Sequence, residues 1–235
     1  MQKQQLTLYH GTDARILSMS KTERAAYFSD VDLALDYLWT IWEPHCEKTM
    51  IRELYYPDGT FMGTMPISFL ESRKQQFLDA GKGTLYSNLH EKVNMWSWTK
   101  QGAKLYQYGA LYVTTSKDTA RDFARRSFAG GERGLIVYRM LEGAEFLGIS
   151  IGHPDGRTAK AIRKIKSFAE ADEPKPVIVV LNDLDPRFFL SEEGEPADMQ
   201  LKMASDTFPD DDIIAEFSFR YLKDVDLSRY PFERV

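Results

Sequence analysis

The chain has 235 residues, a net charge of −5 and 43% hydrophobic residues, which suits one large globular domain or a domain with a sizeable insertion. Its single cysteine, Cys46, excludes an intrachain disulfide and favours a reducing compartment such as the cytoplasm. We expect neither a secretory signal nor a membrane-spanning helix, because the N-terminus lacks an apolar core and no run of about 18 apolar residues occurs. The acidic balance weakens, without excluding, a nucleic-acid partner.

The first hundred residues are expected to be mostly helical after one short strand. Residues 6–10 alternate in character and are followed by a glycine, which predicts a strand running into a loop. Ser20 and Glu23 form a capping-box pattern, because each side chain can accept from a free amide at the start of a helix. That helix is expected to run through Trp42 and to be closed by Pro44.

Three further features follow before the chain changes character. Residues 57–59, Pro-Asp-Gly, predict a turn. The apolar residues between 66 and 80 fit one face of an amphipathic helix, and Gly81 is its expected stop. Residues 84–107 are expected to be mostly helical.

Short strands are expected to dominate the rest of the chain. Apolar runs or alternating patterns predict strands at 111–113, 134–138, 144–151, 176–181, 199–203 and 213–219. Helices are expected at 118–126 and 157–171. The second helix carries a basic run of Arg157, Lys160, Arg163, Lys164 and Lys166. We interpret this run first as a solvated face and second as a surface for phosphates of NAD or of a nucleic acid.

Three segments carry residues suited to chemistry. The first is Tyr9-His10-Gly11-Thr12 at the end of the first strand, and the second is the strand around Tyr112 that leads directly into a helix. The third is a late strand that starts on Glu216. Together and in this order, they resemble the diphtheria-toxin and poly(ADP-ribose) polymerase branch of the ADP-ribosyltransferases, which carries a His-Tyr-Glu triad on three separate strands. The resemblance covers residues 6–15, 108–126 and 205–227 rather than the whole chain.

The resemblance implies a binding site for NAD, with no metal. His10 would hydrogen-bond a ribose hydroxyl, and the backbone of Gly11, beside Thr12, would hold the nicotinamide amide, since a glycine lets the backbone approach a ligand closely. Tyr112 would stack on the nicotinamide ring, and Phe123 would form a second wall.

Two more roles follow from the resemblance. Thr119 would offer the amide a hydroxyl, although it stands one residue away from the family spacing. Glu216 would hold the ribose 2′-hydroxyl and stabilise the positive charge of an oxocarbenium-like transition state. The expected catalytic residues are therefore Glu216, His10 and Tyr112.

A second tyrosine competes for the stacking role. Ala26-Tyr27-Phe28-Ser29-Asp30 imitates the Tyr112 motif, so Tyr27 is an alternative. The capping box just before Tyr27 and its short separation from His10 favour a helix there, and we prefer Tyr112. This choice places nearly a hundred residues between the first two triad members.

The segment 204–212 occupies the place of the family's target-recognition loop. Phe208 and Pro209 would contact the acceptor, and the aspartates at 210–212 would favour a basic one. A solvated turn is the alternative interpretation. The remaining histidines, His45, His90 and His153, have no metal-ligand spacing and are expected to be structural.

The expected fold is α+β, an ADP-ribosyltransferase-like split β-sandwich of two small antiparallel sheets around an NAD cleft. We expect one domain over residues 1–235, with a mostly helical insertion at about 20–107 after the first strand. The expected activity is transfer of one ADP-ribose unit from NAD to a macromolecule, first a protein and alternatively RNA or DNA. A bacterial toxin or effector, a phage-defence component with a neutralising partner and a phage protein all fit, and a catalytically inactive module that binds NAD or the target stays open.

Overall fold

A computed structural model describes residues 7–91, 111–171, 174–191, 195–206 and 217–235. The chain divides into two compact units. Unit 1 comprises Met1–Ala25, Gln107–Glu132 and Phe168–Val235, and unit 2 comprises Ala26–Tyr106 and Arg133–Ser167. The expected mixture of helices with a mostly antiparallel sheet is confirmed.

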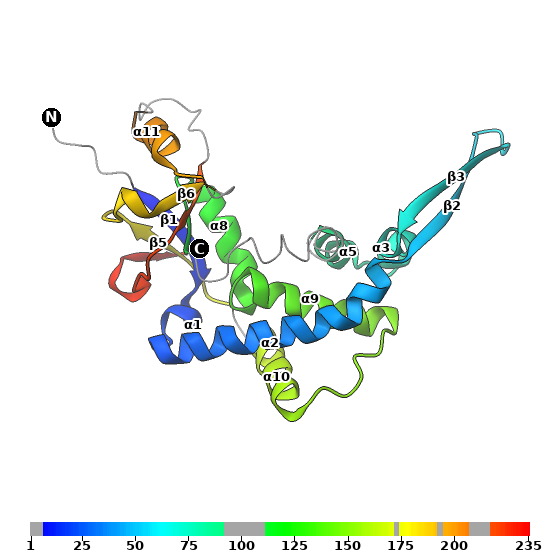
Figure 1. Ribbon diagram of the computed structural model, residues 1–235, viewed down its shortest axis with the longest axis horizontal. Helices are drawn as coiled ribbons and strands as arrows, with labels where there is room; N and C mark the ends of the chain where they lie inside the picture. Colours follow the sequence, from blue (N-terminus) through cyan, green and yellow to red (C-terminus); the bar gives the residue numbers. More distant parts are fainter. Residues whose placement is uncertain (1–6, 92–110, 172–173, 192–194, 207–216) are drawn as a thin grey trace. The chain divides into compact units, whose positions relative to one another are not determined.

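Unit 1 is built on a sheet of six strands. Its elements are β1 (Leu8–Asp13), α1 (Ala14–Leu17), β4 (Leu111–Thr114), α8 (Lys117–Arg126), η2 (Ser127–Ala129), β5 (Pro176–Leu181), η3 (Pro186–Phe188), β6 (Phe189–Ser191), α11 (Asp198–Asp206), β7 (Ser218–Tyr221), η4 (Leu227–Arg229) and β8 (Phe232–Arg234). The strand order is β6-β7-β4-β1-β5-β8, and every described pair is antiparallel. Figure 1 labels β1, β5 and β6 of this sheet. The described strands of unit 1 form a single sheet, and the finer expectation of two small sheets around a cleft is not confirmed.

The two faces of this sheet differ in what covers them. Side chains alternate along β1, so Leu8 and His10 lie on one face and Gly11 on the other. The Leu8 face carries the apolar core of the unit, whose buried members are Leu8, Leu17, Val113, Val177, Val179, Leu181, Phe189, Ala197, Phe219, Tyr221 and Leu227. The Gly11 face packs against α8, the helix that follows β4 directly.

Unit 2 is mostly helical. It contains most of α2 (Lys21–Cys46), the strands β2 (Thr49–Tyr55) and β3 (Phe61–Ser68), the helices α3 (Phe69–Ser72), α4 (Lys74–Asp79) and α5 (Gly83–Leu89), and most of α9 (Glu132–Leu147) and α10 (Gly156–Glu170). Its core includes the fully buried side chains Tyr27, Leu38, Trp42, Leu70, Phe77, Leu89, Met140 and Ile165. Gly143 of α9 allows close packing, because a β-carbon there would lie 3.2 Å from the Trp42 ring.

Several local predictions are confirmed. The amide of Ser20 donates to the Glu23 carboxylate at 2.8 Å, and the amide of Glu23 donates back to the Ser20 hydroxyl at 3.3 Å, so the capping box starts α2. Residues 57–59 form the turn of the β2–β3 hairpin, where Gly59 has a φ of 84°. The strands expected at 111–113 and 176–181 and the helices expected at 118–126 and 157–171 are all present.

Other predictions are wrong. The apolar run at 134–138 lies in α9 rather than in a strand, because the helical spacing continues through Met140 and Ala144, which are also buried. Residues 144–151 contain the end of the same helix, and 199–203 lie in α11. Pro44 lies inside α2 instead of closing it.

The helix expected from residue 66 begins later. β3 continues through Pro66 to Ser68, and the Ser68 hydroxyl caps α3 by accepting from the amide of Glu71 at 3.1 Å. The hairpin before it, which the sequence pattern did not predict, projects beyond α3 (Figure 1). Of the segment expected as an insertion, 20–107, most belongs to unit 2, which also contains residues 133–167.

Candidate functional site

The three motif segments reach three neighbouring strands of the unit 1 sheet. His10 lies in β1, Tyr112 lies in β4 next to it, and β4 pairs on its other side with β7. β7 begins two residues after Glu216. The sheet therefore places side by side three strands that are separated by long stretches of sequence.

His10 makes a defined contact across this sheet. Its Nδ1 lies 2.7 Å from the carbonyl oxygen of Tyr112. A carbonyl oxygen only accepts, so Nδ1 must carry the proton and donate it. In a neutral ring Nε2 is then the acceptor, which suits a ligand hydroxyl that donates to it.

Burial keeps this ring neutral. Loss of solvent lowers the pKa of His10 below its ordinary value of 6.5, and the hydrogen bond to the Tyr112 carbonyl opposes this only in part. At neutral pH His10 is therefore an uncharged imidazole with its proton on Nδ1. This is the state that accepts a hydrogen bond at Nε2.

The lowered pKa of His10 predicts a pH-dependent stability. Below the ordinary histidine pKa the unfolded chain binds a proton that the folded chain does not, so stability falls as pH decreases until the folded pKa is passed. We expect His10→Gln to lose less stability than the wild type between pH values of about 7.5 and 5.5, measured by urea unfolding. His153→Gln, at an exposed position, is the matched control and should behave like the wild type. Equal losses in the wild type and His10→Gln would contradict the assignment.

Gly11 is a site of close backbone packing. A β-carbon at this position would overlap the backbone carbonyl oxygen of Ala120 and lie 2.6 Å from the backbone nitrogen of Ala124. Both atoms belong to α8, so a glycine is needed to seat this helix on β1. Since Tyr9 is opposite Thr114, the alternation places Gly11 and Tyr112 on this same face of the sheet, whereas the His10 side chain lies on the other face with Leu8. The structure thus brings the strands of His10 and Tyr112 together but not the faces on which their side chains lie.

The other two proposed nicotinamide contacts lie on α8. The helix is capped by the Ser116 hydroxyl, which accepts from the amide of Thr119 at 3.1 Å. Thr119 is half-buried and Phe123 is 44% exposed. Phe123 thus presents an aromatic surface to solvent on the helix that covers the Gly11 face, whereas Ala120 and Ala124 are buried on the sheet side.

Tyr27, the alternative stacking residue, lies in a different setting. It belongs to α2 in unit 2, is 1% exposed and has the Lys164 ammonium 5.4 Å from its ring centre. The expectation that this motif is helical is confirmed. A ring buried in a core has little surface left to stack on a ligand, which favours Tyr112.

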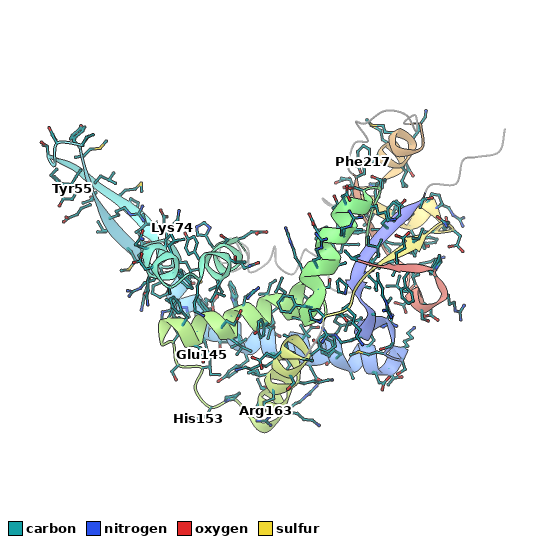
Figure 2. All side chains as sticks on the ribbon, turned by 180° about the vertical axis from the view of Figure 1, so that it is seen from behind. Tyr55, Lys74, Glu145, His153, Arg163 and Phe217 are labelled. Carbon is teal, nitrogen blue, oxygen red and sulfur yellow. The ribbon has the colours of Figure 1, made fainter. Side chains whose placement is uncertain are left out.

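Glu216 and the segment 207–212, with Phe208 and Pro209, lie outside the described residues. The first described residue after Glu216 is Phe217, which Figure 2 marks. The Phe217 carbonyl accepts from the amide of Thr115 at 3.0 Å, and the Phe217 amide donates to the Thr115 hydroxyl at 3.1 Å. These two hydrogen bonds hold the start of β7 beside the end of β4.

An ion pair that sequence reasoning missed fixes the end of β1. Asp13, which is fully buried, accepts from Nε of Arg15 at 2.9 Å and from the amide of Lys175 at 3.1 Å. The same guanidinium donates to the carbonyl oxygens of Phe168 and Phe128 and lies over the Phe168 ring. This network anchors Thr12 and the residues before it. Its only sequence signal is an acid and a base two residues apart at a strand end.

A hollow of about 400 Å³ opens elsewhere in unit 1. It is lined by Val180, Asn182, Asp183, Arg229, Tyr230 and Pro231. Burial, together with a hydrogen bond to Asp183, raises the pKa of Tyr230 to about 12. None of the expected site residues lines this hollow.

Other reactive groups contribute no site among the described residues. Burial raises the pKa of the Cys46 thiol to about 11, so it is not a thiolate at neutral pH. Within the ranges that the structure describes, no group of three or more histidine, cysteine, aspartate or glutamate side chains is arranged to hold a metal ion. None of the described helices has both the length and the apolar character needed to cross a membrane.

Comparison with known proteins finds no matching family model, no matching curated protein and no matching solved structure.

Proposed function

We propose that this protein is an NAD-dependent mono-ADP-ribosyltransferase, with His10, Tyr112 and Glu216 as its catalytic residues. The observation that supports this most is the adjacency of β1, β4 and β7, which are the strands that carry or directly follow the three motif residues. The motif segments are separated by about a hundred residues of sequence, so their meeting in one sheet is a result of the fold.

The chemistry of the proposal divides between the two substrates. The bond between the ribose C1′ and the nicotinamide nitrogen breaks, nicotinamide leaves with the bonding electrons, and a nucleophile of the acceptor forms the new bond at C1′. An anionic carboxylate at Glu216 would stabilise the positive charge that develops on the ribose ring. The neutral His10 ring fits a ribose hydroxyl as the donor to Nε2.

The expected NAD contacts outside the triad fit the proposal to different degrees. They are Phe123, Thr119, Gly11 and Thr12. Phe123 offers an exposed ring on α8, as a wall for nicotinamide requires. Gly11 has a packing reason of its own, so its presence is weaker support for a ligand contact than the sequence alone suggested. Thr12 is 7% exposed, which leaves it a supporting role in β1.

The acceptor proposed first is a protein. The NAD would come from the cytoplasm, either of the producing cell or of a target cell. The biological roles that fit such a transferase are a toxin, an effector or a phage-related modifier, each with a neutralising partner. A nucleic-acid acceptor is the second candidate, because α10 carries a row of exposed cations.

The test is release of nicotinamide from NAD by the purified chain, alone and with a cell lysate. We expect release that rises with lysate, and labelled ADP-ribose on an acceptor that protease removes. Label removed by nuclease instead would assign a nucleic-acid acceptor. NAD binding without release under either condition would replace the enzyme by a binding module.

A further inference from the structure

The outer face of α10 is a continuous basic surface. Helical spacing gathers its buried side chains Thr158, Ala161, Ile162 and Ile165 on one side and its cations on the other. The exposed cations are Arg157, Lys160, Arg163, Lys164 and Lys166. No acidic residue occurs in α10 before Glu170, although acids outnumber bases in the whole chain.

Among the described residues, neighbouring acids engage part of this surface. Arg157 lies close enough to Asp155 to help lower the pKa of that carboxyl, and Lys166 is not counted as free. Lys164 contacts the Asp30 carboxylate of α2 at 2.7 Å, so we do not count it as available. Asp155 caps the start of the helix, accepting from the amides of Arg157 and Thr158 at 2.9 and 2.8 Å. Because those amides are occupied, the surface acts through its side chains and not through the helix N-terminus.

Arg157, Lys160 and Arg163 form the centre of the row. They stand three residues apart, about 4.5 Å along the helix axis for each step, and the row covers about 9 Å. Phosphates of a nucleic-acid strand follow each other at about 3.4 Å along the axis, so the row can face two or three of them. Figure 2 marks Arg163 on α10 and His153 in the loop before it.

We infer that this face of α10 binds the phosphate backbone of a nucleic acid. The outward side chains are basic or, at Ser167, a hydroxyl, and no large apolar side chain lies among them. A protein partner is normally held by an apolar or aromatic centre, and a membrane by an apolar face that inserts. Contacts to phosphates need only cations with long, adaptable stems.

The inference stands on unit 2 alone and does not rest on the proposed transferase activity. It predicts binding in the absence of NAD.

The test is binding of a fluorescent single-stranded RNA of about 20 nucleotides to the full chain, followed by polarisation without NAD. For three phosphate contacts, we expect wild-type affinity to fall roughly 20-fold between about 50 and 200 mM salt. The triple variant Arg157→Gln, Lys160→Gln and Arg163→Gln should bind at least about tenfold more weakly and show a flatter salt dependence.

A second triple variant controls for net charge. Lys48→Gln, Lys74→Gln and Lys82→Gln removes three exposed charges from the same unit and should bind like the wild type. Equal losses in both triple variants, or no binding by the wild type, would overturn the inference. So would displacement of the RNA by polyglutamate as readily as by unlabelled RNA of the same charge, because this would indicate an acidic protein partner. Nicotinamide release is measured in a separate experiment. A failure of the RNA-binding proposal can therefore be distinguished from a failure of the transferase proposal.

Discussion

Replacing Gly11 with alanine is expected to lower the free energy of unfolding by about 3 kcal/mol, because the new methyl group would overlap the backbone of α8. The obstructing atoms are the Ala120 carbonyl oxygen and the Ala124 nitrogen, which cannot turn aside as a flexible side chain would. The helix must therefore shift away from β1 and β5. In a chain of this length, the loss corresponds to a fall in Tm of roughly 6–12 °C, measured by thermal unfolding.

Two further variants separate this cause from general effects of the substitution. Gly156→Ala places a β-carbon in open space at the start of α10 and should leave Tm nearly unchanged. Adding Ala120→Gly to Gly11→Ala should not restore Tm, since the overlap is with backbone atoms. A Gly11→Ala protein with wild-type Tm but weak NAD binding would show that Gly11 is needed for the ligand and not for packing.

The elements predicted correctly are those whose signals are local. The strand at 176–181 is an apolar run led by a proline, and α10 has helical spacing over four turns. α9 was misread because its first residues, Leu135, Ile136 and Val137, are an apolar run that fits a buried strand equally well. Only the continuation through Met140 distinguishes the helix.

The β2–β3 hairpin is not predicted because its sequence carries no regular pattern of polar and apolar residues. Large apolar side chains such as Ile51, Tyr55 and Phe61 are more than half exposed there, so burial imposes no alternation of polar and apolar residues. The turn at 57–59 was recognised, but its chemistry does not tell how far paired strands extend on either side.

The sequence predicts the candidate site as a set of residue types and does not predict its geometry. Nothing local links His10 to Tyr112, which are 102 positions apart, so their hydrogen bond depends on strand order. The role of Gly11 in seating α8 had one visible signal, the small residues Ala120 and Ala124 spaced by four. Two small residues at that spacing are common in helices, and the signal acquires meaning only when β1 lies beneath them.

Replacing Glu216 with glutamine is expected to reduce the rate of nicotinamide release by about 10²–10³-fold, while the Kd for NAD changes far less. Glutamine keeps the size of the side chain and removes its negative charge. A charge that acts on the oxocarbenium-like transition state affects turnover, because the positive charge is not yet present in bound NAD. The hydrogen bonds of Phe217 to Thr115 are made by the next residue along the chain, so the substitution leaves that strand contact in place.

Glu195→Gln is the matched control for this prediction. Glu195 is exposed, and its replacement removes the same charge from the surface of unit 1, so release should stay at the wild-type rate. Unchanged release by Glu216→Gln, with release by the wild type established, would remove Glu216 from the site and with it the triad. If Glu216→Gln lost both NAD binding and nicotinamide release, Glu216 would instead be a residue that contacts NAD before the reaction begins. The transferase proposal requires the split between the two, in which binding is kept and turnover is lost, because only that split places the carboxylate opposite a charge that forms during the reaction.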